Sequence, residues 1–150
     1  MKGTQSDVMR ERPPFFREIE HTGDAAIEVE APSRAQLFAR AALAMARLMV
    51  EEAGIEEHER REIESRGTDD VEILHDLLAS ALNLFLIDGF IWCGASAAEQ
   101  GESVTLTLQG EILDRTRHVL LGEIKAVTYH QLSVMRTADT VWHARIIFDI

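Results

Sequence analysis

Apolar residues recur at helical spacing in two segments of the chain. In the first segment, about residues 34–52, they stand three or four positions apart, so that they share one side of a helix. Ser33 precedes this segment and Gln36 lies three positions later, a capping-box pair that is typical of a helix N-terminus. We therefore predict an amphipathic helix over residues 34–52 that ends before Gly54.

The second helical pattern covers residues 70–88. Asp69 and Glu72 form another capping pair at its start, and Gly89 follows its last residues, where a glycine commonly ends a helix. We therefore predict a second amphipathic helix in this segment. Its apolar stripe is made by Val71, Leu74, Leu78, Ala81, Leu82 and Phe85.

Most of the remaining chain alternates apolar and polar residues, as half-buried strands do. The alternation begins after Asp24 and ends at Pro32, and residues 61–65 predict a short edge strand. In the second half, residues 137–140 have the composition of a turn between two alternating segments, which predicts a hairpin. The strand segments of the second half are residues 90–92, 104–108, 124–130 with a continuation over 131–135, and 141–148.

The order strand, helix, strand, helix, and then several strands is typical of the α+β class. We predict a two-layer fold in which two helices pack on one face of a mostly antiparallel sheet. Residues 1–14 are polar and end in Pro13-Pro14, so we expect a flexible N-terminal arm, followed by a single domain over residues 15–150.

The chain carries an excess of acidic residues: 26 Asp and Glu against 15 Lys and Arg give a formal net charge of −11. Because affinity for nucleic acid rests largely on basic side chains that neutralise phosphates, we do not expect this chain to bind RNA by itself. Its single cysteine, Cys93, leaves no intramolecular disulfide and agrees with a reducing, cytoplasmic location. No apolar segment is long enough to cross a membrane, so we expect no membrane association.

The last predicted strand carries an acidic residue near its end. Phe148 and Ile150 share one face of this strand, so Asp149 faces the other way, beside the α-carboxylate of Ile150. Adjacent carboxylates repel unless a cation neutralises them, and a third oxygen donor such as Asp24 would complete a site for a hard cation. A solvated strand end, with a simple turn before Asp24, is the alternative that the spacing leaves open.

Other polar residues give weaker indications. On a regular strand Lys125 and His130 face opposite sides, which argues against a catalytic pair. His21, His118 and His130 could in principle form a zinc site, but their spacing does not support one and structural histidines are favoured. Gly110-Glu111 predicts a bulge or turn that carries an acid. No nucleophile elbow, phosphate-binding loop or dinucleotide motif occurs in the sequence.

Three motifs, taken in order, resemble those of the archease family. The family's His-Thr-Ala-Asp motif appears with glycine in place of alanine, its Lys-Ala-Val-Thr-Tyr-His motif is unchanged, and its Phe-Asp-Ile motif is present. The helix start at residues 70–74 also resembles the family's Asp-x-Glu-x-Leu-Leu pattern, and the likeness extends from about Glu20 to Ile150. The three motifs are His21–Asp24, Lys125–His130 and Phe148–Ile150.

The resemblance implies a non-catalytic partner of the tRNA-splicing RNA ligase, which joins RNA 2′,3′-cyclic-phosphate or 3′-phosphate ends to 5′-hydroxyl ends. In that role the protein promotes GTP-dependent guanylylation of the ligase and supports multiple turnover, and it meets RNA only through the ligase. The alternative function is a metal-dependent hydrolase that uses Asp24 and Asp149 with a histidine.

The resemblance also implies a metal site. The family's site, described with calcium, corresponds to Asp24, Asp149 and Ile150 of this sequence. Glycine at position 23 loosens the turn ahead of Asp24, which bears on the affinity of the site. Further candidates for residues that support the site or face the ligase are His21, Glu111, Lys125 and His130.

Overall fold

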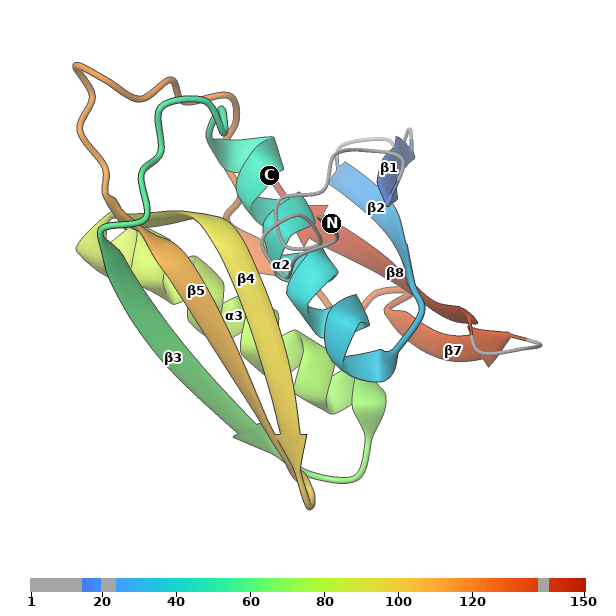
Figure 1. The fold of residues 1–150 in the computed structure, drawn as a ribbon. Helices are drawn as coiled ribbons and strands as arrows, with labels where there is room; N and C mark the ends of the chain where they lie inside the picture. The colour runs from blue at the N-terminus through green and yellow to red at the C-terminus, as the bar shows by residue number, and fades with distance from the viewer. Residues whose placement is uncertain (1–14, 20–23, 138–140) are drawn as a thin grey trace.

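The computed structural model describes residues 15–19, 24–137 and 141–150. The predicted arm and the candidate His21 lie outside these residues, as do residues 138–140 of the predicted turn. The helices and strands are labelled in Figure 1. In chain order they are β1 (Phe16–Ile19), β2 (Asp24–Ala31), α2 (Arg34–Met49), β3 (Glu59–Arg66), α3 (Asp70–Asp88), β4 (Phe90–Gln100), β5 (Ser103–Ile112), β6 (Ala126–Val127), β7 (Ser133–Thr137) and β8 (Val141–Asp149).

The first sheet contains five strands, all paired antiparallel. β8 lies inside this sheet, with β2 along one of its edges and with β6 and β7 at different ends of the other edge. β1 pairs with the outer edge of β2. The pairing of β7 with β8 confirms the predicted hairpin.

The second sheet is formed by β3, β5 and β4, with β5 in the middle. β3 is the edge strand predicted at residues 61–65, and its Glu and Arg side chains are of the kind that protects an edge from pairing with another chain. The register of β4 on β5 shifts between Trp92 and Gly94, so the bulge of this pair lies in β4, opposite Gly110, and not at Gly110-Glu111 as predicted; both of these residues are paired in β5. The α+β class is therefore confirmed, with the strands divided between two sheets where the pattern predicted one.

α2 lies between the two sheets and packs against β2 of one and β4 of the other (Figure 1). Its residues from Ala41 to Ala46 are all buried, so this part of the helix has no exposed side. A helix that is apolar all round needs cover on more than one face, and here each sheet covers one. α3 packs against β3, α2 and β6, and it thereby connects the two sheets.

Both predicted helix starts are confirmed by their caps. The side chain of Ser33 accepts a hydrogen bond from the backbone N–H of Gln36 at 3.1 Å, and Asp69 caps α3 in the same way through two backbone N–H groups. α3 is followed by Gly89 in the left-handed conformation, with φ of 73°. In the described part of the chain neither helix is long and apolar enough to cross a membrane.

Two segments differ from the predicted boundaries. α2 ends at Met49, because Val50 leaves the helix and forms a β-bridge with Leu120. The strand predicted over residues 124–130 is reduced to β6, and the chain then turns through Gln131, whose φ is 54°. The turn separates β6 from β7, so the two cannot form one continuous strand.

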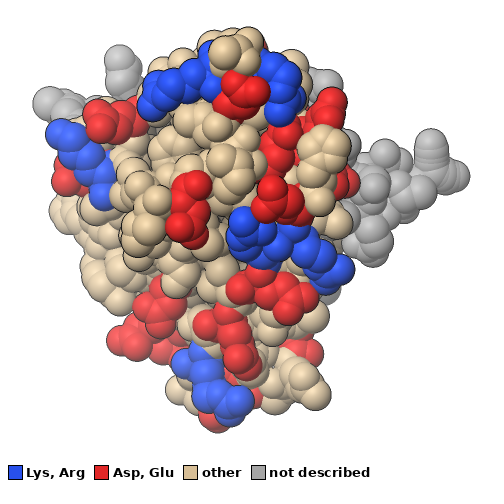
Figure 2. Space-filling view, turned by 90° about the vertical axis from the view of Figure 1, so that its left-hand side faces the viewer, with Lys and Arg blue, Asp and Glu red and all other residues tan. Residues whose placement is uncertain are grey.

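Charged side chains of both signs are mixed on the face of the molecule that Figure 2 shows. Figure 2 shows Lys and Arg interspersed with Asp and Glu on the face that carries the end of α3 and the edge of the second sheet. No continuous basic surface is seen on this face, in agreement with the net charge of −11.

Candidate metal centre and the Glu111 network

Asp24 and Asp149 lie directly opposite each other, at the first residue of β2 and the last residue of β8. The register that pairs them is set by buried residues further along the two strands, among them Ile27 opposite Ile146. A shift of one residue would turn these apolar side chains to the wrong face, so burial fixes the pairing of the two acids as well. Opposite residues of antiparallel strands share a face, with Cβ atoms about 4.5–5.5 Å apart.

The other edge of β8 brings a third segment to this position. Ala126 of β6 pairs with Asp149, and the backbone N–H of Lys125 donates to the backbone carbonyl of Asp149 at 2.7 Å. Lys125 is exposed, and Ile150 retains 47% of its exposure directly after Asp149. Candidate residues from the start, the end and the 125–130 segment of the chain thus meet at one end of the sheet.

The donors at this position suit a hard cation. Carboxylate oxygens are preferred by calcium, and the exposed side chain of Asp149 stands across from Asp24. The backbone carbonyl of Asp149 is already used by Lys125, so the side chain is the group that Asp149 has to offer. Two adjacent carboxylates repel each other, and this repulsion favours a bound cation.

α3 packs against the 125–130 segment through His75. The ring Nε2 of His75 donates to the backbone carbonyl of Val127 at 2.9 Å, and the same ring stacks on Tyr129 with centroids 3.8 Å apart. Desolvation against α3, together with the negative charges of Asp76 and Glu72, raises the pKa of Tyr129. Tyr129 therefore remains a neutral ring that packs on α3.

Glu111 lies in the other sheet, near the end of β5, and is only 5% exposed. Its Oε1 accepts from the Arg117 guanidinium at 2.9 Å, and its Oε2 accepts from the backbone N–H of Glu56 at 2.8 Å and from Nε2 of His118 at 2.9 Å. The Arg117 hydrogen bond, followed by those from Glu56 and His118, lowers the pKa of Glu111 to about 2 against the effect of burial. Glu111 is therefore ionised at neutral pH.

His118 is a structural histidine, as the spacing favoured. Its Nδ1 accepts from the backbone N–H of Asp114 at 2.9 Å, so Nε2 carries the proton that it donates to Glu111. Both ring nitrogens are thus engaged, and neither can bind zinc without losing a buried hydrogen bond. His130 is exposed in the turn after β6, and its backbone N–H donates to Thr128 Oγ1 at 3.2 Å.

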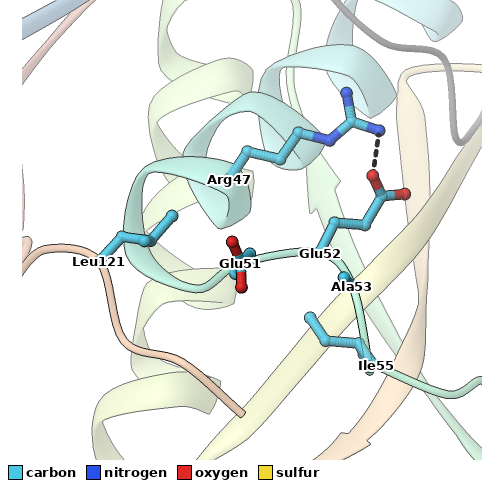
Figure 3. A pocket seen from close by; sticks show the side chains of 7 residues that line it. Arg47, Glu51, Glu52, Ala53, Ile55 and Leu121 are labelled. Atoms are coloured by element: carbon cyan, nitrogen blue, oxygen red, sulfur yellow. Dashed lines mark ion pairs between the residues drawn. The ribbon is translucent and has the colours of Figure 1, made fainter.

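An open hollow of about 690 Å³ borders the C-terminal end of α2 (Figure 3). Arg47 and Glu52 form an ion pair of 3.3 Å at its edge, and Leu121 faces it from the loop before β6. Its lining residues, all within the described ranges, include no histidine, cysteine or hydroxyl side chain. The hollow therefore offers no nucleophile or general base other than carboxylates.

Sequence reasoning missed several residues that the structure brings into the sites. His75 stands next to the apolar stripe of its helix, and a histidine within such a helix is the signal that could have drawn attention to it. Glu56 and His58 belong to a segment that the pattern treats only as charged, and Arg117 precedes His118 in a polar turn. The partners of His75 and of the Glu56 backbone lie 52 and 55 residues away in the chain, so no local spacing marks these two contacts.

The match to a known protein family includes all the residues of the candidate metal centre and of the Glu111 network that the structure describes. The model of the archease protein family matches residues 16–150, which include both strand ends, the 125–130 segment and the Glu111 network. The chain belongs to the archease family. The resemblance carried by the three motifs is thereby confirmed.

Archease relatives are similar over nearly their entire length. The protein archease of Methanopyrus kandleri is 37% identical over 90% of this chain and 99% of its own length. That of Methanosarcina barkeri is 33% identical over 90% of this chain and 95% of its own. The solution structure of Methanobacterium thermoautotrophicum protein 1598 superposes with a TM-score of 0.75 at 27% identity, covering 91% of this chain and 99% of that one. The α+β architecture therefore agrees with that of this structure.

Proposed function

We propose that this member of the archease family is a metal-binding, non-catalytic activator of the tRNA-splicing RNA ligase that joins 3′-phosphate and 5′-hydroxyl ends. In this role it promotes GTP-dependent guanylylation of the ligase and supports multiple turnover. Family membership and one geometric observation support the proposal: the strand register sets Asp24 against Asp149 at a single end of the sheet.

In the proposed site Asp24, Asp149 and Ile150 hold a divalent cation, most simply calcium. All the ligand atoms are oxygens, and the separation of opposite residues, about 4.5–5.5 Å between Cβ atoms, suits two carboxylates that share one ion. When bound, the cation supplies positive charge that holds the two strand ends together. Lys125, at the adjacent edge of β8, adds a positive side chain that is available to a phosphate-bearing partner.

The proposed partner is the ligase, and RNA is met only through it. The net charge of −11 and the mixed charges in Figure 2 oppose direct binding to a polyanion. Lys125 and His130 are both exposed, one before and one after β6, so we propose that they face the ligase, with His21 as a further candidate.

The hydrolase alternative receives less support from the geometry. A metal-dependent hydrolase needs a histidine or carboxylate to activate water beside the metal. His118 and His75 are engaged with Glu111 and Val127, respectively, and His143 lies 3.8 Å from Glu28, so this alternative would have to use another histidine, such as His130, which is exposed in the turn after β6. An assay with generic phosphoesters and added calcium separates the two functions, because a non-catalytic activator should give no turnover above background.

The decisive experiment is a guanylylation assay of the partner ligase with labelled GTP. Asp24→Asn and Asp149→Asn should each weaken calcium binding, measured by calorimetry, at least tenfold and should reduce ligase guanylylation in parallel. Asp88→Asn, at the exposed end of α3, is the matched control and should behave as wild type. Wild-type calcium affinity in both site variants would contradict the metal site, and full activation by both would contradict its role.

A further inference from the structure

A second group of metal-ligating side chains lies at the end of β5, in the three-stranded sheet. One ligand atom each from Glu56, His58 and Glu111 lies within 4.8 Å of the others. Nε2 of His58 is 2.6 Å from a carboxylate oxygen of Glu56 and 3.9 Å from Oε1 of Glu111. This group is separate from the proposed site of Asp24 and Asp149 at the ends of β2 and β8, which is called the strand-end site below. It is also separate from the hollow at the end of α2.

We propose that Glu56, His58 and Glu111 bind a divalent transition-metal ion with the preferences of Zn²⁺. The proposal does not depend on the function proposed above, because it uses none of the same residues. Three protein ligands, with water in the fourth position, make a common tetrahedral zinc site.

The distances are close to those that zinc requires. Zinc lies about 2.0–2.2 Å from nitrogen and oxygen ligands, so in a tetrahedral site neighbouring ligand atoms stand about 3.4 Å apart. The two His58 distances, 2.6 and 3.9 Å, bracket this value. The side chains of Glu56 and His58 are 61% and 62% exposed, so rotations of these surface groups can adjust the distances without disturbing the core.

Glu111 provides the rigid part of the site. An ionised carboxylate has about four acceptor positions, and three of these take the hydrogen bonds from Arg117, His118 and the Glu56 backbone. Oε1 receives one of the three and also faces His58, so one acceptor position remains for a metal ion. Hydrogen bonds that orient a ligating carboxylate are typical of metal sites.

Arg117 carries a positive charge that would repel a cation bound to Glu111. Its guanidinium is shared between Glu111 at 2.9 Å and Asp114 at 3.5 Å. Together with Glu56, these are three carboxylates against one guanidinium, a local formal charge of −2 with His58 neutral. A divalent ion would bring this local charge to zero, so Arg117 does not exclude it.

The donor set predicts which metal binds. An imidazole nitrogen favours zinc and related ions over calcium, which prefers oxygen ligands only. The two sites of the protein should therefore differ in selectivity: zinc at the His58 site and calcium at the strand ends.

The test measures Zn²⁺ binding by calorimetry in an Asp149→Asn background, which removes the strand-end site. His58→Ala should weaken zinc binding at least tenfold, and the folding of this surface variant can be checked by circular dichroism. The matched control is His143→Ala, since His143 also stands beside one glutamate, Glu28, at 3.8 Å. That variant should bind zinc as the background does.

Nuclear magnetic resonance of the imidazole groups gives a second measurement in the wild-type chain. Zinc should shift the ring signals of His58, and calcium should not. Zinc affinity that is unchanged in His58→Ala would overturn the proposal. Equal losses in His58→Ala and His143→Ala would overturn it as well, because they would indicate nonspecific binding to surface histidines.

Discussion

The carboxylate of Glu111 is a buried charge that three hydrogen bonds stabilise. It receives one hydrogen bond from a guanidinium, one from an imidazole and one from a backbone N–H; the first two come from the neighbouring residues Arg117 and His118 and the third from Glu56. A buried charge without such partners would cost several kcal/mol. The network also ties the turn around Arg117 to the segment around Glu56, on both sides of the end of β5.

Glu111→Gln tests the contribution of this charge to stability. Its folded pKa, about 2, is below the ordinary value of 4.5, so ionised Glu111 stabilises the fold above pH 4.5 and this contribution is lost as the pH falls toward 2. At pH 7 the variant should lose about 1.5–3 kcal/mol of unfolding free energy, the range for hydrogen bonds to a charged group. Urea unfolding at pH 7 and pH 3 should show a smaller difference from wild type at pH 3.

A control variant distinguishes the loss of the buried Glu111 charge from the loss of an exposed glutamate charge. Glu62 is exposed on β3 and pairs with Arg60 at 3.1 Å, so Glu62→Gln should change the unfolding free energy by less than about 0.5 kcal/mol at either pH. A loss for Glu111→Gln that stays equal at pH 7 and pH 3 would show that packing, and not charge, explains the effect.

At the scale of elements, the position of β6 depends on its contacts with α3. A strand of two residues forms few hydrogen bonds, and β6 pairs only with the last part of β8. The hydrogen bond and the ring stack that His75 makes add to the support that β6 receives from the burial of Val127 in the core. Because the backbone of Lys125 then reaches Asp149, α3 also orients one side of the proposed metal site.

Two substitutions of His75 separate its two contacts. His75→Phe keeps a flat ring on Tyr129 but removes the donor to Val127, whereas His75→Gln keeps a donor and removes the stack. We expect each variant to lose about 1 kcal/mol of stability. In His75→Phe the amides of Lys125 and Thr128, which donate to β8, should exchange hydrogen faster, while those of β5 should not. Unchanged exchange at Lys125 and Thr128 would contradict the role of His75 in holding β6.

On the scale of the whole molecule, α2 and α3 join two sheets into one core. α2 contacts a strand of each sheet, and α3 contacts β3 of one and β6 of the other. The strand ends that carry Asp24 and Asp149 are supported by this core, while the carboxylates themselves are at its boundary. Binding of a cation between these carboxylates should therefore raise the unfolding free energy of the whole domain without any change in core packing.

Calcium should raise the unfolding free energy of the wild-type protein. If only the folded state binds, a concentration of one hundred times Kd adds about 2.7 kcal/mol. Asp149→Asn should show no such gain, and without calcium it should be at least as stable as wild type, since it removes a repulsion between adjacent carboxylates. Thermal unfolding with calcium and with a chelator measures both effects, and an equal gain in the two proteins would contradict the site.

The sequence alone determined the features that depend on neighbours in the chain. The caps at Ser33 and Asp69, the glycine that follows α3 and the β7–β8 hairpin were all predicted, because a few adjacent residues carry their hydrogen bonds and dihedral preferences. The three family motifs also predicted family membership, since they need only residue identity and order. The proposal that Asp24 and Asp149 belong to one site came from the resemblance and from charge, not from any local pattern.

Only the tertiary structure decided which distant residues meet. The number of sheets depended on the buried alanines of α2, because a pattern of large apolar residues does not show that a helix is covered on two sides. The pairing of Asp24 with Asp149 depended on the register of β2 and β8, which burial of Ile27 and Ile146 sets across the sheet. The contact of Glu111 with the backbone of Glu56 joins segments that are 55 residues apart in sequence. Such contacts arise from the burial of the whole core, and no short stretch of residues encodes them.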